Sequence, residues 1–236
     1  MYLLTPSEVK ALVRRNLDEL EPNNSLMAMY DDQNNDNQSI DNIIYRCIPD
    51  AINTVVLAAP VKLLEGEFVS IPTEDLLVDS DGVLSFSIDN TTPMLRLVSL
   101  RSDDSPVVVT DIIAEASPEG RKQLNKHIRG QYDRPRLVRL QEEVLNGLSV
   151  PVIGFKYYSL NPDGENFDYY QAGALNPIHL CIFKEQFYQQ TPPLGWTGYN
   201  IPRMLRQNIL DCVTAMVLEA YSDQRAQVFY QKANNF

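Results

Sequence analysis

The stretch PRMLRQNILDCVTAMVLEAYSDQRAQVFYQKANNF, residues 202–236, decides the helical part of the fold. Its apolar residues recur at spacings of three and four, which predicts one apolar helix face made of Leu205, Ile209, Cys212, Val213, Met216, Val217 and Ala220. Ser222 and Asp223 interrupt this pattern, and it resumes with Ala226, Phe229, Tyr230 and Ala233. Because chain ends usually fray, aromatic residues here predict a helix that docks on a partner element or on a neighbouring subunit.

A second helix is marked near the start of the sequence. Thr5 can cap it, Pro6 suits its first position, and Glu8 completes a T-x-x-E capping box. Its apolar stripe consists of Val9, Leu12, Val13, Leu17 and Leu20. Pro22 is expected to end this helix, because proline cannot donate the backbone hydrogen bond that a helix interior needs.

Residues 39–59 predict a further helical region that is apolar enough to lie in a core. Two apolar stripes follow one another, Ile40, Ile43, Ile44, Cys47 and Ile48, and then Ala51, Ile52, Val55 and Val56. Pro49 falls between the stripes and is expected to kink or break the helix there.

The middle of the chain changes to the patterns of β-strands. Five stretches are expected to be strands: 83–89, 94–101, 134–140, 150–160 and 179–185. Residues 90–93 read as a hairpin loop between the first two strands, and residues 161–164 read as a turn after the fourth. A short helix is expected over 117–128. Residues 186–201 read as an irregular loop in which Trp196 and Tyr199 pack against the body.

This order of helices, strands and helices predicts an α+β fold, and it differs from the alternating pattern of a nucleotide-binding parallel sheet. We expect residues 1–60 and 200–236 to form a helical bundle. Residues 61–199 would then form an inserted, antiparallel β-rich domain with a short helix near 117–128.

The composition is that of an ordinary globular protein with an acidic surface. The chain has 236 residues and a formal net charge of −11. Such a charge argues against broad, non-specific nucleic-acid binding, because that affinity comes from neutralising phosphates. The start of the sequence does not resemble a signal peptide, and no segment has the roughly 20 apolar residues of a membrane span. We therefore expect the protein to be made and kept in a cytoplasm.

The sequence contains no common catalytic motif, so we expect neither an enzyme nor a bound cofactor or metal. There is no GxSxG, Walker A, GxGxxG or HExxH pattern. The three cysteines stand among apolar residues and are expected to be buried in a reducing compartment. His179 and Cys181 share a strand face, but no orienting group is evident in the sequence. The polar run 31–39 reads as a solvated loop; a calcium site is the weaker alternative.

One stretch of the sequence is strongly basic. It comprises Arg121, Lys122, Lys126, Arg129, Arg134, Arg136 and Arg139, with Asp133 as the single acidic residue among them. These residues form either a surface balanced by acids elsewhere in the fold or a contact site for an acidic partner. That partner could be a neighbouring acidic subunit or DNA phosphates. In a chain this acidic, a protein partner is favoured.

The segment ILDCVTAMVLEAYSDQRAQVFYQKANNF (209–236) resembles the end of bacteriophage head-to-tail connector proteins, the adaptor or gatekeeper rings of short-tailed and crAss-like phages. The opening helix TPSEVKALVRRNLDEL (5–20) fits the same arrangement. The resemblance implies a structural virion protein that forms a ring, usually a dodecamer, between portal and tail. DNA would pass through its channel without specific binding. The basic stretch would meet a neighbour's acidic surface, and Phe229, Tyr230 and Phe236 would contact the portal or an adjacent subunit.

Two other functional classes stay open. One is a cytoplasmic hydrolase or transferase with an unrecognised site, which a pocket joining His179, Cys181 and a carboxylate would favour. The other is a monomeric, tail-associated interaction module. Under the ring hypothesis, we expect deletion of residues 222–236 to leave a folded domain and to weaken assembly.

Overall fold

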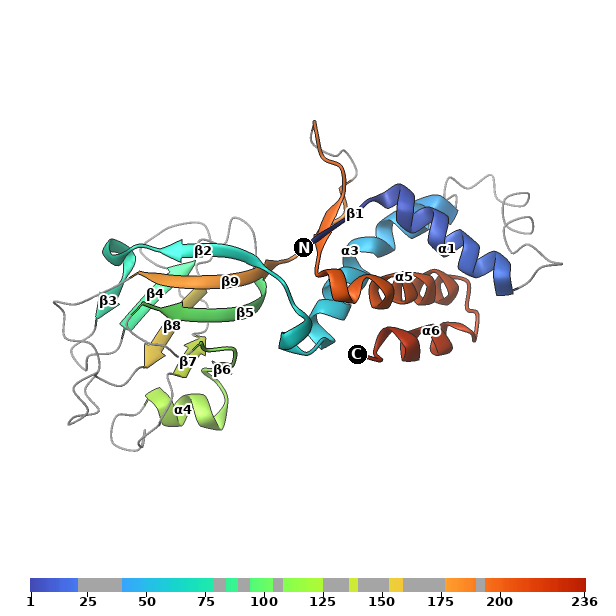
Figure 1. The fold of residues 1–236 in the computed structure, drawn as a ribbon. Coiled ribbons are helices and arrows are strands. Elements are labelled where there is room, and N and C mark those ends of the chain that lie inside the picture. Colours follow the sequence, from blue (N-terminus) through green and yellow to red (C-terminus); the bar gives the residue numbers. More distant parts are fainter. Residues whose placement is uncertain are drawn as a thin grey trace. The chain divides into compact units, whose positions relative to one another are not determined.

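The computed structural model describes residues 1–20, 40–78, 84–88, 94–103, 108–124, 136–139, 153–158, 177–189 and 194–236. Figure 1 shows both helices and antiparallel sheets, which confirms the α+β class. The chain divides into two compact units. Unit 1 comprises Met1–Gly66 and Glu185–Phe236, and unit 2 comprises Glu67–Lys184.

Residues 61–66 and 185–199, which the sequence assigned to the inserted domain, belong to unit 1. Contacts on each side account for this difference. The amino terminus forms an ion pair with Glu65. Asn53 Nδ2 donates to the Gln186 carbonyl oxygen, and the Gln186 backbone N–H donates to Asn53 Oδ1, both at 2.9 Å. The spacing of apolar residues along the sequence carries no signal for such polar contacts, so it could not predict that these residues belong to unit 1.

Unit 1 contains four described helices and one pair of strands (Figure 1). The helices are α1 (Pro6–Leu20), α3 (Ile40–Ala58), α5 (Arg206–Ala220) and α6 (Ala226–Ala233). The strands are β1 (Tyr2–Leu4) and β10 (Tyr199–Ile201), and the short 3-10 turns are Val61–Leu63 and Arg203–Leu205. Helix α5 packs against α1, α3 and α6, so segments from both ends of the sequence share one core.

Helix α5 is buried on more sides than its sequence predicts. Its buried residues are Ile209, Leu210, Asp211, Cys212, Val213, Thr214, Ala215, Val217 and Leu218. An apolar helix face becomes a fully surrounded helix when other helices cover its remaining sides. The polar members of this set have partners: Thr214 Oγ1 donates to the Leu210 carbonyl oxygen at 2.9 Å and accepts from Asn16 Nδ2 at 3.3 Å.

The predicted cap of α1 is confirmed, because the Glu8 backbone N–H donates to Thr5 Oγ1 at 3.2 Å. The Glu8 carboxylate also accepts from Arg206 Nη2 at 2.6 Å and from Tyr2 Oη at 2.7 Å. Desolvation acts to raise the pKa of Glu8, but these hydrogen bonds outweigh it and the pKa is lowered. Tyr2, Glu8 and Arg206 thus join the start of the chain to the start of α5.

Helix α3 runs through Pro49 without a break. Of the two outcomes predicted at Pro49, a kink or a break, the break is therefore wrong. One proline removes one backbone hydrogen bond and adds a local steric conflict. Apolar burial offsets that cost, because Ile44, Ile48 and Ile52 lie in the core on both sides of Pro49. At the start of α3, Asp41 binds Arg14 and Lys10 of α1.

The prediction of an irregular loop over 186–201 is wrong at its end, where Tyr199–Ile201 forms a strand antiparallel to Tyr2–Leu4. The sequence did not indicate either strand, because each has only three residues. Tyr199 is buried, as predicted, and its ring meets Trp196 edge-on with centroids 5.1 Å apart. Burial raises the pKa of Tyr199 to about 12.

Unit 2 contains two described sheets (Figure 1). The three-stranded sheet has the order β2-β9-β5, with β2 (Glu67–Ile71), β9 (Ile178–Lys184) and β5 (Met94–Ser102). The five-stranded sheet has the order β3-β4-β8-β7-β6, with β3 (Leu77–Val78), β4 (Leu84–Ile88), β8 (Ile153–Tyr158), β7 (Arg136–Arg139) and β6 (Ile112–Ala114). A 3-10 turn, Thr73–Asp75, follows β2.

The predicted hairpin between the first two middle strands is wrong. Strand β4 pairs with β3 and β8, whereas β5 pairs with β9 in the other sheet. Apolar residues of both sheets instead share one core, among them Phe86 of β4, Leu100 of β5 and Leu180 of β9. Alternation identifies each strand, but it does not say whether two strands pair at their edges or face each other across a core.

One described strand pair departs from the predicted antiparallel pattern, because β6 and β7 are parallel. Helix α4 (Pro118–Leu124) lies between them in sequence, as parallel strands require a long crossover connection. Ser117 caps α4 through Oγ, which accepts from the Gly120 backbone N–H at 2.9 Å. The predicted helix start near 117 is thus confirmed, and residues 125–128 lie outside the described residues.

Candidate functional site

The α5–α6 turn shows how the chain end is ordered. Ser222 has φ 57°, the left-handed conformation that commonly ends a helix. The Ser222 backbone N–H donates to the Glu219 carbonyl oxygen at 2.8 Å, and that of Asp223 donates to the Leu218 carbonyl oxygen at 3.0 Å. This pair of bonds is a Schellman motif. The interruption at Ser222-Asp223 in the sequence is therefore a helix end, after which the chain reverses into α6.

Helix α6 docks on α5 of the same chain. Ala226, Phe229 and Ala233 are buried. Asn208 of α5 donates from Nδ2 to the Ala233 carbonyl oxygen at 2.9 Å and to the Asn235 carbonyl oxygen at 3.2 Å. Because the last carbonyl groups of a helix have no partner inside it, Asn208 supplies donors that reduce fraying. The docking partner that the sequence predicts for Phe229 lies within the same subunit.

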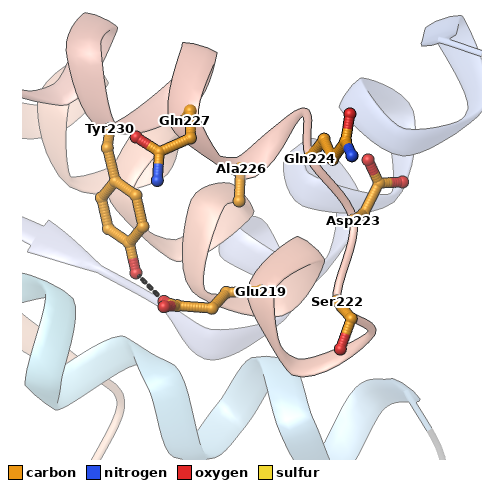
Figure 2. Close-up of a pocket in the computed structure, with 7 residues that line it drawn as sticks. All are labelled: Glu219, Ser222, Asp223, Gln224, Ala226, Gln227 and Tyr230. Carbon is orange, nitrogen blue, oxygen red and sulfur yellow. Dashed lines mark hydrogen bonds between the residues drawn. The ribbon is translucent and has the colours of Figure 1, made fainter.

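The turn between these helices borders a shallow hollow of about 430 Å³ (Figure 2). It is lined by Glu219, Ser222, Asp223, Gln224, Ala226, Gln227 and Tyr230. Figure 2 shows Tyr230 directed at Glu219, and its hydroxyl donates to Glu219 Oε2 at 2.5 Å. Burial and the Glu219 carboxylate raise the pKa of Tyr230. Arg225 donates to Asp223 and lowers the pKa of that carboxyl group. The hollow is acidic, but both carboxylates already have partners.

The three predicted contact residues of the chain end differ in accessibility. Phe229 is 5% exposed and belongs to the core of unit 1. Tyr230 is half-buried beside the hollow, and Phe236 is 41% exposed. Only Tyr230 and Phe236 are therefore accessible to another molecule.

The structure describes part of the predicted basic stretch. Arg121 and Lys122 are exposed in the last turn of α4. Arg136 and Arg139 are the first and last residues of β7. Lys126, Arg129 and Arg134 lie outside the described residues, as does the polar run 31–39. Among the described residues of the basic stretch, Arg121 and Lys122 are thus the two whose side chains are seen to be exposed.

The outer face of the β2-β9-β5 sheet brings together a serine, a histidine and an aspartate. Ser70 lies opposite His179 in the β2–β9 register, with Oγ 3.1 Å from His179 Nδ1. His179 Nε2 lies 3.4 Å from Asp103 Oδ2. The sequence showed no orienting group for His179, because Asp103 is 76 residues away and only strand pairing brings it near. Cys181, the predicted thiol partner, is buried.

Unit 1 exposes apolar side chains beside the last turns of α3. The two hydrogen bonds between Asn53 and Gln186 hold Gln186 against this helix, and Phe187 and Tyr188 follow Gln186 in the chain. Leu57 lies one turn after Asn53 on the same helix face. Leu57 is 55% exposed, Phe187 49% and Tyr188 41%. We call Leu57, Phe187 and Tyr188 the apolar patch; its residues come from two distant segments, so the sequence did not indicate it.

Two of the three cysteines are buried as predicted. Cys181 and Cys212 are buried and Cys47 is half-buried, and none of the three forms a disulfide. Burial raises the pKa of Cys47 to about 11 and that of Cys212 to about 12, so both are thiols at neutral pH. Within the described ranges, no three side chains of His, Cys, Asp or Glu gather in a way that could hold a metal ion. In that same part of the chain, every helix is too short or too polar to span a bilayer.

Asp211 is a buried carboxyl group on α5, and we expect Asp211→Asn to stabilise the protein at neutral pH. Desolvation raises the pKa of Asp211, which outweighs its bond from Gln207 Nε2 at 3.2 Å and the nearby charge of Lys232. A carboxyl group with a raised folded pKa takes up a proton on folding, so its ionised form costs stability at neutral pH and less as the pH falls. The gain should be on the order of 1 kcal/mol.

Urea unfolding of both proteins at neutral and mildly acidic pH would measure this effect. The difference between Asp211→Asn and the parent should shrink as the pH falls through the folded pKa of Asp211. A variant that is less stable than the parent at neutral pH would show that the interaction with Lys232 outweighs desolvation.

No protein-family model matches this chain, and no curated protein matches it.

Proposed function

We propose that this chain is a structural virion protein that forms a ring between portal and tail and seals or extends the DNA channel. Helices from both chain ends are gathered in unit 1, and the β-rich unit 2 is inserted between them. A helical bundle with an inserted β-rich domain is the arrangement that the connector resemblance implies. The ring is a homo-oligomer, a dodecamer by that resemblance, with the portal and neighbouring tail proteins as partners.

The apolar patch is the observation that carries this proposal. Scattered apolar side chains are normal on a protein surface, but a contiguous group marks an interaction site. Leu57, Phe187 and Tyr188 are large exposed side chains on two segments that the hydrogen bonds between Asn53 and Gln186 join. Aromatic residues of this kind are common energetic centres of protein–protein interfaces.

The charge distribution supports the same function. A ring lumen with net negative charge repels DNA phosphates and does not trap them, and the chain carries a formal charge of −11. Arg121 and Lys122 supply exposed positive charge on α4. In the ring they meet an acidic surface of a neighbour.

The mass of the purified particle tests the proposal. Light scattering and negative-stain microscopy should detect a closed ring, either of the protein alone or after its portal is added. A protein that stays monomeric in both conditions would overturn the ring assignment and would favour the monomeric tail-associated module.

Variants of the apolar patch should weaken assembly without unfolding the subunit. We expect Leu57→Ser combined with Phe187→Ser to raise the concentration needed for ring formation by at least about tenfold, because interface anchors of this kind typically contribute more than 1 kcal/mol each. Leu77→Ser is the control, since Leu77 is also an exposed leucine, at 67%, but belongs to unit 2. Equal effects of the two changes on assembly would remove the patch from the interface.

A further inference from the structure

We propose that Ser70, His179 and Asp103 form an acyl-transfer site that hydrolyses carboxylic esters, an activity separate from ring formation. The three residues come from three adjacent parts of one sheet: β2, β9 and the residue that follows β5. The pairing of β2 with β9 places Ser70 directly opposite His179, because the two residues are register partners. Sites that stand on paired strands are held more accurately than sites on loops.

The geometry assigns a role to each group. The carboxylate of Asp103 near Nε2 favours the histidine tautomer that carries its proton on that nitrogen. Nδ1 is then free to accept the proton of the Ser70 hydroxyl, 3.1 Å away. Ser70 is the nucleophile, His179 is the general base, and Asp103 is a positioning residue that orients the ring. Compared with the serine proteases, the two ring nitrogens exchange partners: Nδ1 faces the serine and Nε2 faces the carboxylate, which still lie on opposite sides of the imidazole.

Two neighbours on the same sheet face complete the site. Arg101 is the β5 register partner of His179 and is exposed, so its guanidinium can donate to an oxyanion formed next to Ser70. Phe68 lies two residues before Ser70, on the same face of β2, and is 82% exposed. Its ring offers an apolar contact for the acyl or alkyl group. Because Ser70 and Asp103 are exposed, an ester carried on the surface of a larger molecule can reach them.

The reaction needs only the ester and water. Ser70 Oγ bonds to the carbonyl carbon while its proton passes to His179 Nδ1, and the carbonyl oxygen becomes an oxyanion. The ester C–O bond then breaks, the alcohol leaves with the proton from Nδ1, and an acyl ester of Ser70 remains. Water attacks that ester and gives its proton to Nδ1. The carboxylic acid leaves, and Ser70 Oγ takes the proton back.

Hydrolysis of p-nitrophenyl acetate by the full chain tests this proposal. We expect Ser70→Ala and His179→Gln each to lower the enzyme-dependent rate by about a hundredfold. Asp103→Asn should lower kcat and leave KM unchanged, which a merely structural role would not do. Ser99→Ala is the matched control: Ser99 is the register partner of Cys181 on the same sheet face, and its loss should leave the rate unchanged.

Labelling with a fluorophosphonate identifies the nucleophile directly. Mass spectrometry should place the adduct on Ser70, and His179→Gln should prevent labelling while circular dichroism shows an unchanged fold. An undiminished rate in Ser70→Ala, or an adduct on another residue, would overturn the assignment. If His179→Gln lost the rate and Ser70→Ala did not, the histidine would act without the serine. That outcome would also overturn the assignment of Ser70 as the nucleophile.

Discussion

Phe229→Ala is expected to lower the free energy of unfolding by about 3–4 kcal/mol. The side chain of Phe229 is 5% exposed and is held between α6 and α5, and the Lys232 ammonium group lies 4.6 Å from the centre of its ring. Alanine would remove this apolar contact and leave a cavity that the two helices cannot fully close. Urea unfolding should show a lower midpoint with an unchanged slope.

Phe236→Ala provides the matched control for this prediction. Phe236 is the same residue type on the same chain end, but it is 41% exposed. Its loss should change the free energy of unfolding by no more than about 0.5 kcal/mol. Equal losses for both variants would mean that α6 does not dock through Phe229.

The docking of α6 also changes what we expect from deleting residues 222–236. The sequence favoured a folded remainder with weakened assembly. In the structure, the deletion removes the buried Ala226, Phe229 and Ala233 together and uncovers part of α5. The loss of their buried apolar area destabilises unit 1 itself. A test of assembly is therefore better made by substitution at exposed residues than by truncation.

Gly198→Ala is expected to destabilise the protein by about 2–3 kcal/mol. A Cβ atom at this position would lie 2.3 Å from the Leu4 carbonyl oxygen and 3.1 Å from Thr5 Cα. Both are backbone atoms, so no side-chain rotation can relieve the clash. The β1–β10 pairing, which follows directly after Gly198, would have to shift. Thermal unfolding of the variant would measure the cost as a lower Tm.

Gly195→Ala separates this steric effect from backbone strain. Gly195 has φ 86°, which disfavours alanine, but nothing lies within 4 Å of an added Cβ atom. We expect a loss of about 1 kcal/mol from conformation alone. If Gly195→Ala lowered Tm as much as Gly198→Ala, the close approach to Leu4 would not be the cause.

The two proposals concern different units and can fail separately. Ring formation depends on the apolar patch of unit 1, whereas ester hydrolysis depends on Ser70, His179 and Asp103 of unit 2. A monomeric protein that still hydrolyses the ester would keep the second proposal and exclude the first. A ring without hydrolysis would do the reverse.

Local elements could be predicted from the sequence where their signals lie within a few residues. The capping box at Thr5 and Glu8, the helix end at Ser222 and the alternation of β9 all predicted structure that the chain adopts. Each depends on spacing or on backbone conformation, which neighbouring residues set. The sequence also indicated that Phe229 needs a docking partner, because an aromatic residue near a chain end is otherwise exposed.

Which distant segments meet could not be predicted from the sequence and is seen in the folded chain. The tertiary structure placed Phe229 on α5 of its own subunit, continued α3 through Pro49, and assigned β4 and β5 to different sheets. It also brought Asp103 and Ser70 to His179, and Phe187 to the end of α3. Burial and pairing between remote segments depend on the whole chain, and an apolar repeat shows that a face must be covered without showing what covers it.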